Sequence, residues 1–249
     1  MSPRIIDEQT LQAREQEILE TARQLVKDYG VAGLTMDKVV AKVPYSKGTV
    51  YNHFSCKEDL LAGICVDCMR MLLPMFRRIM LYQGNSRDRM IAVCFAYMLF
   101  AMRYPDRFMM VILAKTPGLK EKASPGRCAD LETLDADLLG VALQIIQQGI
   151  EAGELELPAH MDPSQVAFSL WSSSFGALAL LNEGVEVCAV REGLLAEVEV
   201  LNNANTMLNG YQWKPCSDFD WKATVAQLKE FVFASEVEEL RKRGLTLAV

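Results

Sequence analysis

Basic and polar side chains are concentrated between Lys38 and Lys57. This window holds four lysines and no acidic residue, although the chain of 249 residues has a net charge of −6. Its centre reads Ser-Lys-Gly-Thr-Val-Tyr-Asn-His-Phe over residues 46–54. Hydroxyl, amide and ammonium groups at this density can hydrogen-bond the phosphates and base edges of a nucleic acid. The chemistry that these residue types indicate is therefore binding.

A helix over this central stretch sorts its side chains into two faces. At about 100° per residue, Val50 and Phe54 point inward together. On the outer side, Gly48 lets the backbone come close to a ligand, and Thr49 and Asn52 can meet base edges. The side chains that can reach phosphates beside them are Lys47, Tyr51 and His53. An ordinary solvated helix face is the alternative for each of these residues.

The residues around this helix predict a helix-turn-helix. Apolar residues repeat at helical spacing over 11–29, and Gly30 follows where a helix stop is expected. Thr35 can cap a second helix of two turns, which Pro44 ends. A fourth helix begins near Ser55, where Lys57 and the free amides add an anion site. Two short helices joined by a tight turn fit the major groove of DNA, which is about 12 Å wide.

Three segments carry a family resemblance: Leu34-Thr35-Met36, the stretch from Ser46 to Phe54, and Lys57-Glu58-Asp59-Leu60. They resemble the N-terminal domain of the TetR/AcrR family over about residues 14–64. The resemblance implies a ligand-responsive repressor that binds a palindromic operator as a homodimer. It also implies DNA contacts at Thr35, Ser46, Lys47, Thr49, Tyr51, Asn52, His53 and Lys57. A fainter likeness, Gly149 to Leu155 followed by Asp162-Pro163, is similar to the family's link into its dimerisation helices.

The turn before Ser46 departs from the family pattern. Pro44 and Tyr45 stand where a glycine and an aliphatic residue are usual. Since proline cannot take a positive φ, we expect a different turn backbone, with Tyr45 packed beneath it. This departure keeps open the alternative of a helical small-molecule-binding protein whose DNA-binding domain is degenerate.

The remainder of the chain predicts an all-α fold, because no stretch shows the alternation of strands. We expect a helix-turn-helix domain over 1–60 and a helical effector-binding and dimerisation domain over 61–249. The expected helices of the second domain are 57–80 with a bend at Pro74, 87–103, 105–114, 130–152, 163–182, 191–209 and 221–243.

Soft and aromatic side chains in the second domain fit a pocket for an apolar or aromatic effector. The candidates are Met69, Phe76, Phe95, Met98, Met102, Met109, Trp171 and Phe175. Plain core packing is the alternative for any one of them. Family resemblance favours a cavity somewhere among them, and nothing in the sequence identifies the effector.

Twenty residues without charge, 163–182, lie between Asp162 and Glu183 and are rich in small side chains. Small residues let helices approach closely, so we expect a homodimer interface that combines this helix with the helix at 191–209. An intrachain core is the alternative. The segment after Tyr211 extends past the usual family length, and we expect it to pack on the dimer region.

An enzyme is the less favoured reading. Cys65 and Cys68 have a spacing seen in redox and metal sites, but they fall in a helix without a second pair or a nearby histidine. We therefore expect no catalytic residue, metal or cofactor. The odd number of cysteines and the polar N-terminus predict a cytoplasmic protein, and the apolar run over 90–102 is too short for a membrane span, which needs about 18 residues.

Overall fold

The computed structural model describes residues 7–113, 115–181, 189–216 and 219–249. All regular elements in these ranges are helices, which confirms the predicted all-α fold. Two compact units divide the chain: unit 1 contains 1–69 and 109–134, and unit 2 contains 70–108 and 135–249. Each unit is thus built from two separate stretches of sequence. The domain boundary at residues 60 and 61 stays a prediction.

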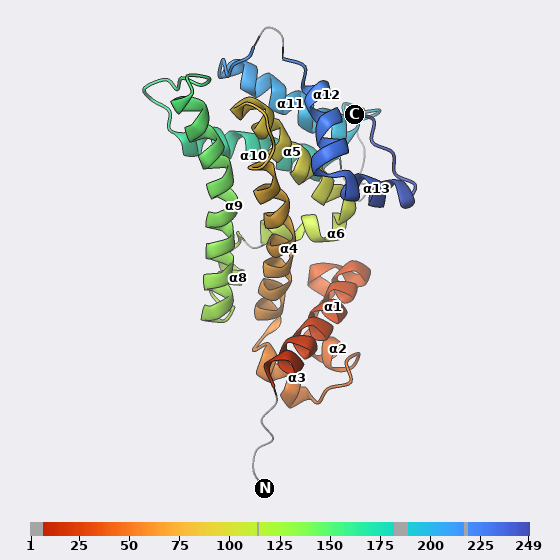
Figure 1. Ribbon diagram of the computed structural model, residues 1–249. Coiled ribbons are helices and arrows are strands. Elements are labelled where there is room, and N and C mark those ends of the chain that lie inside the picture. The colour runs from red at the N-terminus through yellow and green to blue at the C-terminus, as the bar shows by residue number, and fades with distance from the viewer. Residues whose placement is uncertain (1–6, 114, 182–188, 217–218) are drawn as a thin grey trace. The chain divides into compact units, whose positions relative to one another are not determined.

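Unit 1 contains the helix-turn-helix and a second group of short helices (Figure 1). Buried residues of α1, among them Ile18, Leu19 and Leu25, form its core together with Val39 and Val50 from the short helices. Its helices are α1 (Glu8–Gly33), α2 (Met36–Val40), α3 (Lys47–His53), α7 (Met110–Leu113) and α8 (Pro117–Lys120). Two longer helices begin in it, α4 (Lys57–Ile79) and α9 (Pro125–Glu151).

The first helix is interrupted where the sequence predicts a stop. Gly30 has φ 68° and ψ 171°, a backbone conformation that side chains rarely allow. The helix resumes for three residues and ends at Gly33. The interruption lets Leu34, which is fully buried, turn into the core directly before α2.

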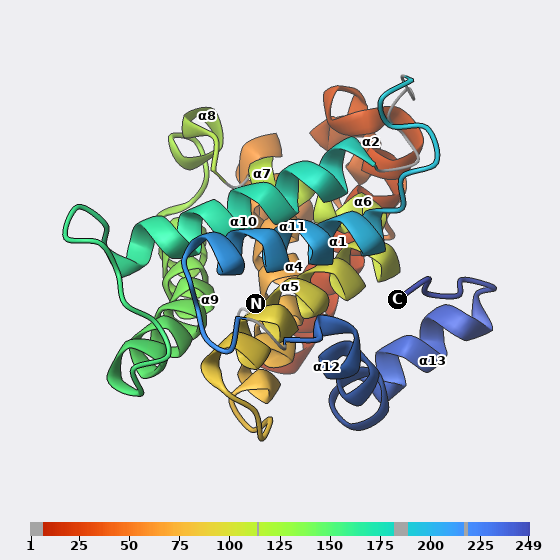
Figure 2. The ribbon, with the colours of Figure 1, turned by 90° about the horizontal axis from the view of Figure 1, so that it is seen from above.

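Unit 2 is organised around α5 (Ser86–Arg103). This helix contains the apolar run over 90–102, and an apolar helix of this kind needs cover on most sides. Figure 2 shows α10 (Pro163–Leu180) and α11 (Ala196–Gly210) along one flank, and α12 (Trp221–Gln227) and α13 (Ala234–Lys242) along the other. No helix in the described part of the chain is long and apolar enough to cross a membrane.

Several helix boundaries differ from the sequence prediction. The helix expected over 105–114 is two short ones, α6 (Pro105–Phe108) and α7, with a turn at Met109. The next helix begins at Pro125 instead of 130, since a proline at the first helical position needs no hydrogen-bond partner for its nitrogen. The helix expected from 191 begins at Ala196, because Gly193 with φ 79° forms a turn before it. Of the helix expected over 163–182, residue 182 lies outside the described residues, as does Glu183.

The C-terminal segment is also divided. In place of one helix over 221–243 there are α12, a π-helical turn η1 (Leu228–Val232) and α13. The break falls at Phe233, whose fully buried ring packs edge-on against Phe95, with centroids 5.9 Å apart. We expected this segment against the dimerisation helices. Instead, α12 and α13 pack along α5.

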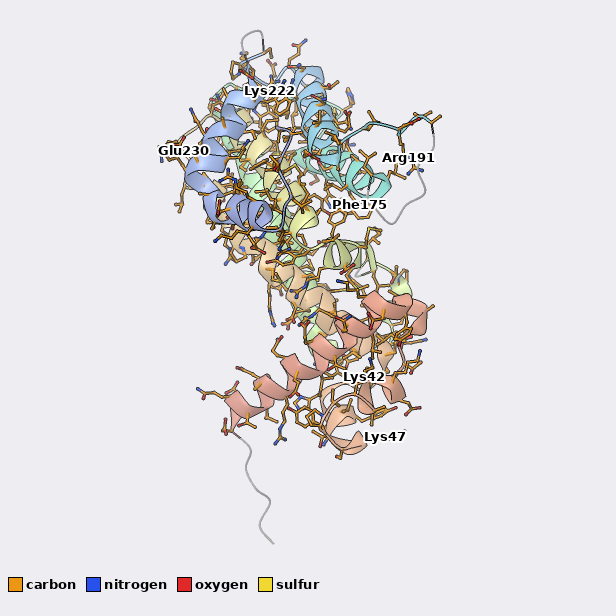
Figure 3. All side chains as sticks on the ribbon, turned by 90° about the vertical axis from the view of Figure 1, so that its right-hand side faces the viewer. Lys42, Lys47, Phe175, Arg191, Lys222 and Glu230 are labelled. Atoms are coloured by element: carbon orange, nitrogen blue, oxygen red, sulfur yellow. The ribbon has the colours of Figure 1, made fainter. Side chains whose placement is uncertain are left out.

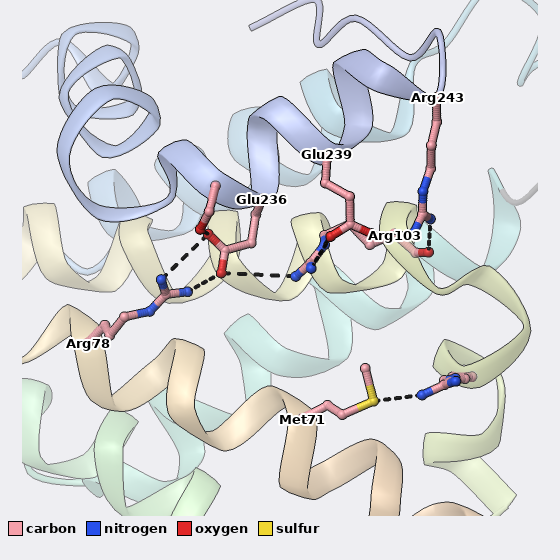
Figure 4. Close-up of polar contacts among 8 residues, drawn as sticks. Met71, Arg78, Arg103, Glu236, Glu239 and Arg243 are labelled. Atoms are coloured by element: carbon pink, nitrogen blue, oxygen red, sulfur yellow. Dashed lines mark hydrogen bonds and ion pairs between the residues drawn. The ribbon is translucent and has the colours of Figure 1, made fainter.

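Alternating charges attach α13 to neighbouring helices of unit 2 (Figure 4). Arg78 of α4 pairs with Glu236, which also accepts a hydrogen bond from Ser235 at 2.9 Å. Arg103 of α5 pairs with Glu239, its Nε 2.9 Å from a carboxylate oxygen. The Glu236 side chain is only 9% exposed. Burial by itself would raise the pKa of Glu236, but hydrogen bonds from Arg78 and Ser235 lower it below the usual 4.5.

We therefore expect Glu236→Gln to reduce stability in a pH-dependent way. A lowered pKa in the folded state gives stability that is present above the unfolded pKa and is lost as the pH falls through the folded pKa. At pH 7 the loss should be about 1–2 kcal/mol, since Arg78 stays partly hydrated. Denaturant unfolding at pH 7, 5 and 4 should show the wild type and the variant converging in acid.

Glu238→Gln is a matched control on the same helix. Glu238 pairs with Arg241 at 3.0 Å, but both side chains are largely exposed. Its replacement should change the free energy of unfolding by less than about 0.5 kcal/mol. A wild-type protein and a Glu236→Gln variant that lose stability in parallel from pH 7 to 4 would contradict the assignment.

Candidate nucleic-acid interface

The second helix is held by its cap. The Thr35 hydroxyl accepts a hydrogen bond from the Lys38 amide at 3.3 Å, as the sequence predicts. Met36 and Val39 are buried beneath it. Lys38 and Lys42 are exposed, and Figure 3 labels Lys42 and Lys47 on the part of unit 1 that α2 and α3 form. The helix thus presents amines at its surface.

The turn between α2 and α3 has no residue with positive φ. Pro44 is exposed, and the chain turns on hydrogen bonds from Ala41 and Val43 to carbonyl groups of α2. Tyr45 is half-buried, and its contacts are with α1: its hydroxyl donates to Glu17, and the Arg14 guanidinium lies 5.7 Å from its ring centre. The hydrogen bond to Glu17 raises the pKa of Tyr45. The aromatic side chain thereby ties the turn to α1.

The third helix has the two faces that its sequence predicts. Val50 and Phe54 are fully buried, which confirms the inner face. Ser46 caps the helix by accepting from the Thr49 amide at 3.2 Å. A Cβ at Gly48 would meet only the Ser46 hydroxyl, at 3.9 Å. Packing within the chain therefore does not require glycine there.

Polar groups on the outer face are arranged for contact with a ligand. Asn52 is exposed and Tyr51 is 38% exposed, whereas Thr49 is half-buried with its hydroxyl 3.0 Å from that of Ser46. Lys47 lies between the helices, 3.0 Å from a carboxylate oxygen of Asp37 and 5.5 Å from the centre of the Tyr51 ring. The hydrogen bond to Asp37 raises the pKa of Lys47. Both partners are mostly exposed, so the amine can exchange Asp37 for a phosphate.

His53 faces away from this surface. Its side chain is 10% exposed, and Nδ1 lies 3.8 Å from a carboxylate oxygen of Glu15 on α1. The helical projection places it beside the outer face, but the fully buried Phe54 that follows it draws this end of α3 toward α1. A phosphate contact by His53 stays a prediction.

The start of α4 lies directly after α3. Lys57 is its first residue and is half-buried. The predicted capping pair of Ser55 and Glu58 is replaced by Asp59, whose carboxylate accepts from the Ser55 amide at 3.1 Å, while the Cys56 thiol accepts from the Asp59 amide at 3.4 Å. The result is a helix start that remains next to the recognition surface. Asp37, the acidic partner of Lys47, is a residue that the sequence analysis missed.

The predicted effector residues are distributed over both units. Met69, which is buried, and Met109, which is 38% exposed, belong to unit 1. In unit 2, Phe95 and Met98 are fully buried, Phe76 is nearly so, and Met102 is half-buried. Phe95 packs against the C-terminal segment, as a core residue would. These placements leave the effector site a prediction.

Trp171 and Phe175 do lie together, in an aromatic cluster of unit 2. Their ring centres are 6.1 Å apart, and Phe175 lies 5.4 Å from Phe108. The Trp171 indole donates to the Tyr97 hydroxyl at 3.3 Å. Burial raises the pKa of Tyr97, so its hydroxyl stays neutral. The cluster offers flat apolar faces with one hydroxyl among them.

The cysteines do not form a metal site in the described part of the chain. Cys65 and Cys68 are buried in α4, and the Cys65 thiol donates to the Met110 carbonyl at 3.3 Å. No group of three potential metal ligands occurs among the described residues. Cys188 lies outside them.

Comparisons with known proteins agree with this geometry. The family described as "Bacterial regulatory proteins, tetR family" matches residues 18–64, and the family described as "Tetracyclin repressor-like, C-terminal domain" matches residues 90–186. An HTH-type transcriptional regulator of Mycobacterium tuberculosis is 25% identical over 195 residues, covering 68% of this chain and 81% of the relative.

Solved structures share the fold. A protein of unknown function from Rhodococcus sp. RHA1 superposes with a TM-score of 0.64 at 17% identity, over 85% of this chain and 100% of that one. A TetR/AcrR regulator of Thermobifida fusca gives 0.56 at 22% identity, over 80% and 98%. The two family matches together cover more than half of the sequence, and the first contains α2, α3 and the start of α4. The chain therefore belongs to the tetR family of bacterial regulatory proteins.

Proposed function

We propose that the chain is a repressor that binds a palindromic operator as a homodimer and releases it when an apolar or aromatic small molecule binds. The observation that carries this proposal is the build of α3: Val50 and Phe54 anchor it, and the opposite face is polar and accessible. A helix of this kind enters the major groove. Family membership supports DNA binding and regulation in general.

The proposed DNA contacts fall into two classes. Thr49 and Asn52 read base edges, and Gly48 allows the backbone to approach. The residues proposed to bind phosphates are Thr35, Ser46, Lys47, Tyr51, His53 and Lys57. Phosphate contacts set affinity and its salt dependence, whereas base contacts set sequence preference. Retardation of DNA from upstream of the chain's own gene tests the proposal, and failure to retard any duplex selected from a randomised pool would overturn it.

Helices α10 and α11 supply the proposed dimer interface. On α10, Phe168 is 61% exposed and Leu180 is 57% exposed, although no charged residue lies between Pro163 and Leu180. A Cβ added at Gly176 would meet nothing within 4 Å. Exposed apolar and small residues on one helix favour close packing against a second copy. An isologous interface would then set the spacing of two half-sites.

Gly176→Arg should convert the dimer to a monomer without unfolding the protomer. The new side chain has space in the isolated chain, but it would place a charge between two closely packed copies. Light scattering after gel filtration measures the mass. Gly140→Arg on α9 is the matched control, because its Cβ also meets nothing and should leave a dimer. A wild-type monomer at micromolar concentration would disprove the interface.

The aromatic cluster of unit 2 is the proposed effector site. Tyr97, Phe108, Trp171 and Phe175 offer stacking faces, and the Tyr97 hydroxyl is a single polar group that could orient a ligand. A thermal-shift screen of hydrophobic and aromatic compounds, followed by operator retardation, tests this site. Compounds that stabilise the wild type but not Phe175→Ala, and that weaken retardation, would support it. Stabilisation that never affects retardation would contradict it.

A further inference from the structure

The start of α9 contributes a side chain to the helix-turn-helix unit. Arg127 lies near the beginning of this helix, in the stretch 109–134 that belongs to unit 1. One of its terminal nitrogens is 3.2 Å from both carboxylate oxygens of Asp59, and the other is 3.2 Å from Glu15. Its guanidinium carbon lies 4.3 Å from the centre of the Phe54 ring. A single side chain therefore touches α1, the end of α3 and the start of α4.

Burial makes these contacts specific. The Asp59 side chain is 2% exposed and that of Arg127 is 15% exposed. The same carboxylate accepts from the amides of Ser124 at 2.8 Å and Ser55 at 3.1 Å. Burial alone would raise the pKa of Asp59, but these hydrogen bonds and the charge of Arg127 lower it. The carboxylate is thus ionised and held from both sides of the joint.

Phe54 is enclosed on its other side by backbone. A Cβ added to Gly63 would lie 3.1 Å from the Phe54 ring and 3.3 Å from Arg127 Nε. The ring that anchors α3 therefore lies between the α4 backbone and the Arg127 guanidinium. Glu15 provides a second path, since its other carboxylate oxygen is 3.8 Å from His53 at the end of α3.

We propose that Arg127 is a positioning residue for DNA binding, fixing the end of α3 through Phe54 and through Glu15. This inference rests on the proposed role of α3 as the recognition helix. The matched helix-turn-helix region ends at residue 64, so Arg127 comes from the part of the chain assigned to the other family domain. Because α9 continues into unit 2, its start links DNA affinity to a helix other than α4.

Arg127→Met tests the proposal, because methionine keeps the length of the side chain and removes its charge and donors. Operator affinity should fall about tenfold as the end of α3 loosens. The slope of log affinity against log salt should stay unchanged, since Arg127 makes no phosphate contact in this scheme. Hydrogen exchange should quicken in peptides covering 46–56 and stay unchanged over 86–103. Arg127→Lys should fall between the two.

The control is Arg77→Met, which removes a surface ion pair with Asp137 in unit 2. It should change neither the affinity nor the exchange. If Arg127→Met does not fold, Glu15→Gln removes one arm alone and should give a smaller change in the same two readouts. A salt slope reduced by about 0.9 would make Arg127 a direct phosphate contact and overturn the proposal.

Other outcomes also decide against it. Unchanged affinity and exchange would leave Arg127 without a positioning role, and faster exchange in all peptides would show only general destabilisation. If the wild type binds no DNA, the proposed function fails. The exchange measurement then still shows whether Arg127 holds α3.

Discussion

Thr49→Ala combined with Asn52→Ala should weaken operator binding about a thousandfold. A base contact contributes about 1–3 kcal/mol, and a dimer loses each contact twice, so four losses at the low end amount to about 4 kcal/mol. Binding to unrelated DNA should change little, because the phosphate contacts remain. Fluorescence anisotropy with operator and non-operator duplexes at several salt concentrations measures both.

The fold should survive this double substitution. Ser46 caps α3 through the Thr49 backbone amide, which alanine retains. Asn52 is exposed, and alanine is a better helix former than threonine or asparagine. The loss would therefore reflect recognition and not unfolding. Thr133→Ala with Gln144→Ala, which removes a hydroxyl and an amide from exposed positions of α9, is the matched control.

Retained operator affinity in the double variant would remove α3 from recognition. An equal loss on operator and non-operator DNA would contradict the division of roles in another way, since it would make the two residues phosphate contacts. Only a loss confined to the operator agrees with base reading by the outer face of α3.

Local features of the interface are predictable from sequence because short-range rules set them. The inner face of α3 follows from helical periodicity, and the caps at Thr35 and Ser46 follow from side-chain oxygens next to free amides. The interruption at Gly30 follows from the conformational freedom of glycine. Each of these involves residues within one or two helical turns.

Long-range contacts have no such signal. Arg127 meets Asp59 across 68 positions of sequence, and nothing around either residue predicts the pair. The orientation of His53 depends on Glu15 of another helix. The split of the C-terminal helix at Phe233 depends on a cavity-filling contact with Phe95, which outweighs local helix propensity. Tertiary packing decides these features.

Arg87 shows the same limit and gives the largest stability effect that we expect. An arginine in the first turn of a helix is ordinarily assigned to the surface, yet Arg87 is fully buried. One terminal nitrogen donates to the carbonyl oxygens of Trp213 and Pro215, at 2.5 and 2.8 Å. The other donates to the side-chain oxygens of Asn205 and Asn209, at 2.8 and 2.6 Å. All four acceptors lie more than a hundred residues away along the chain.

Arg87→Met should destabilise the protein by about 3–5 kcal/mol and lower its melting temperature by about 10 °C. Methionine fills the space of the aliphatic part, but it leaves four oxygen acceptors with fewer donors in a region with little water. It also removes the guanidinium stacked 4.2 Å from the centre of the Phe219 ring. Scanning calorimetry measures the loss. Trp213, fully buried in the wild type, should shift its emission to longer wavelength when Trp171 and Trp221 are replaced by Phe.

Arg89→Met, two residues further along the helix, is the control. Arg89 is half-buried and donates to the Gln148 side chain at 2.8 Å and to the Tyr82 carbonyl at 3.2 Å, both of which water can reach. Its loss should be about 1 kcal/mol or less. Equal effects of the two substitutions would mean that the buried charge costs about as much in desolvation as its hydrogen bonds return. We expect the larger loss at Arg87 because its partners are uncharged oxygens, which stay buried and lose their donors when the guanidinium is removed.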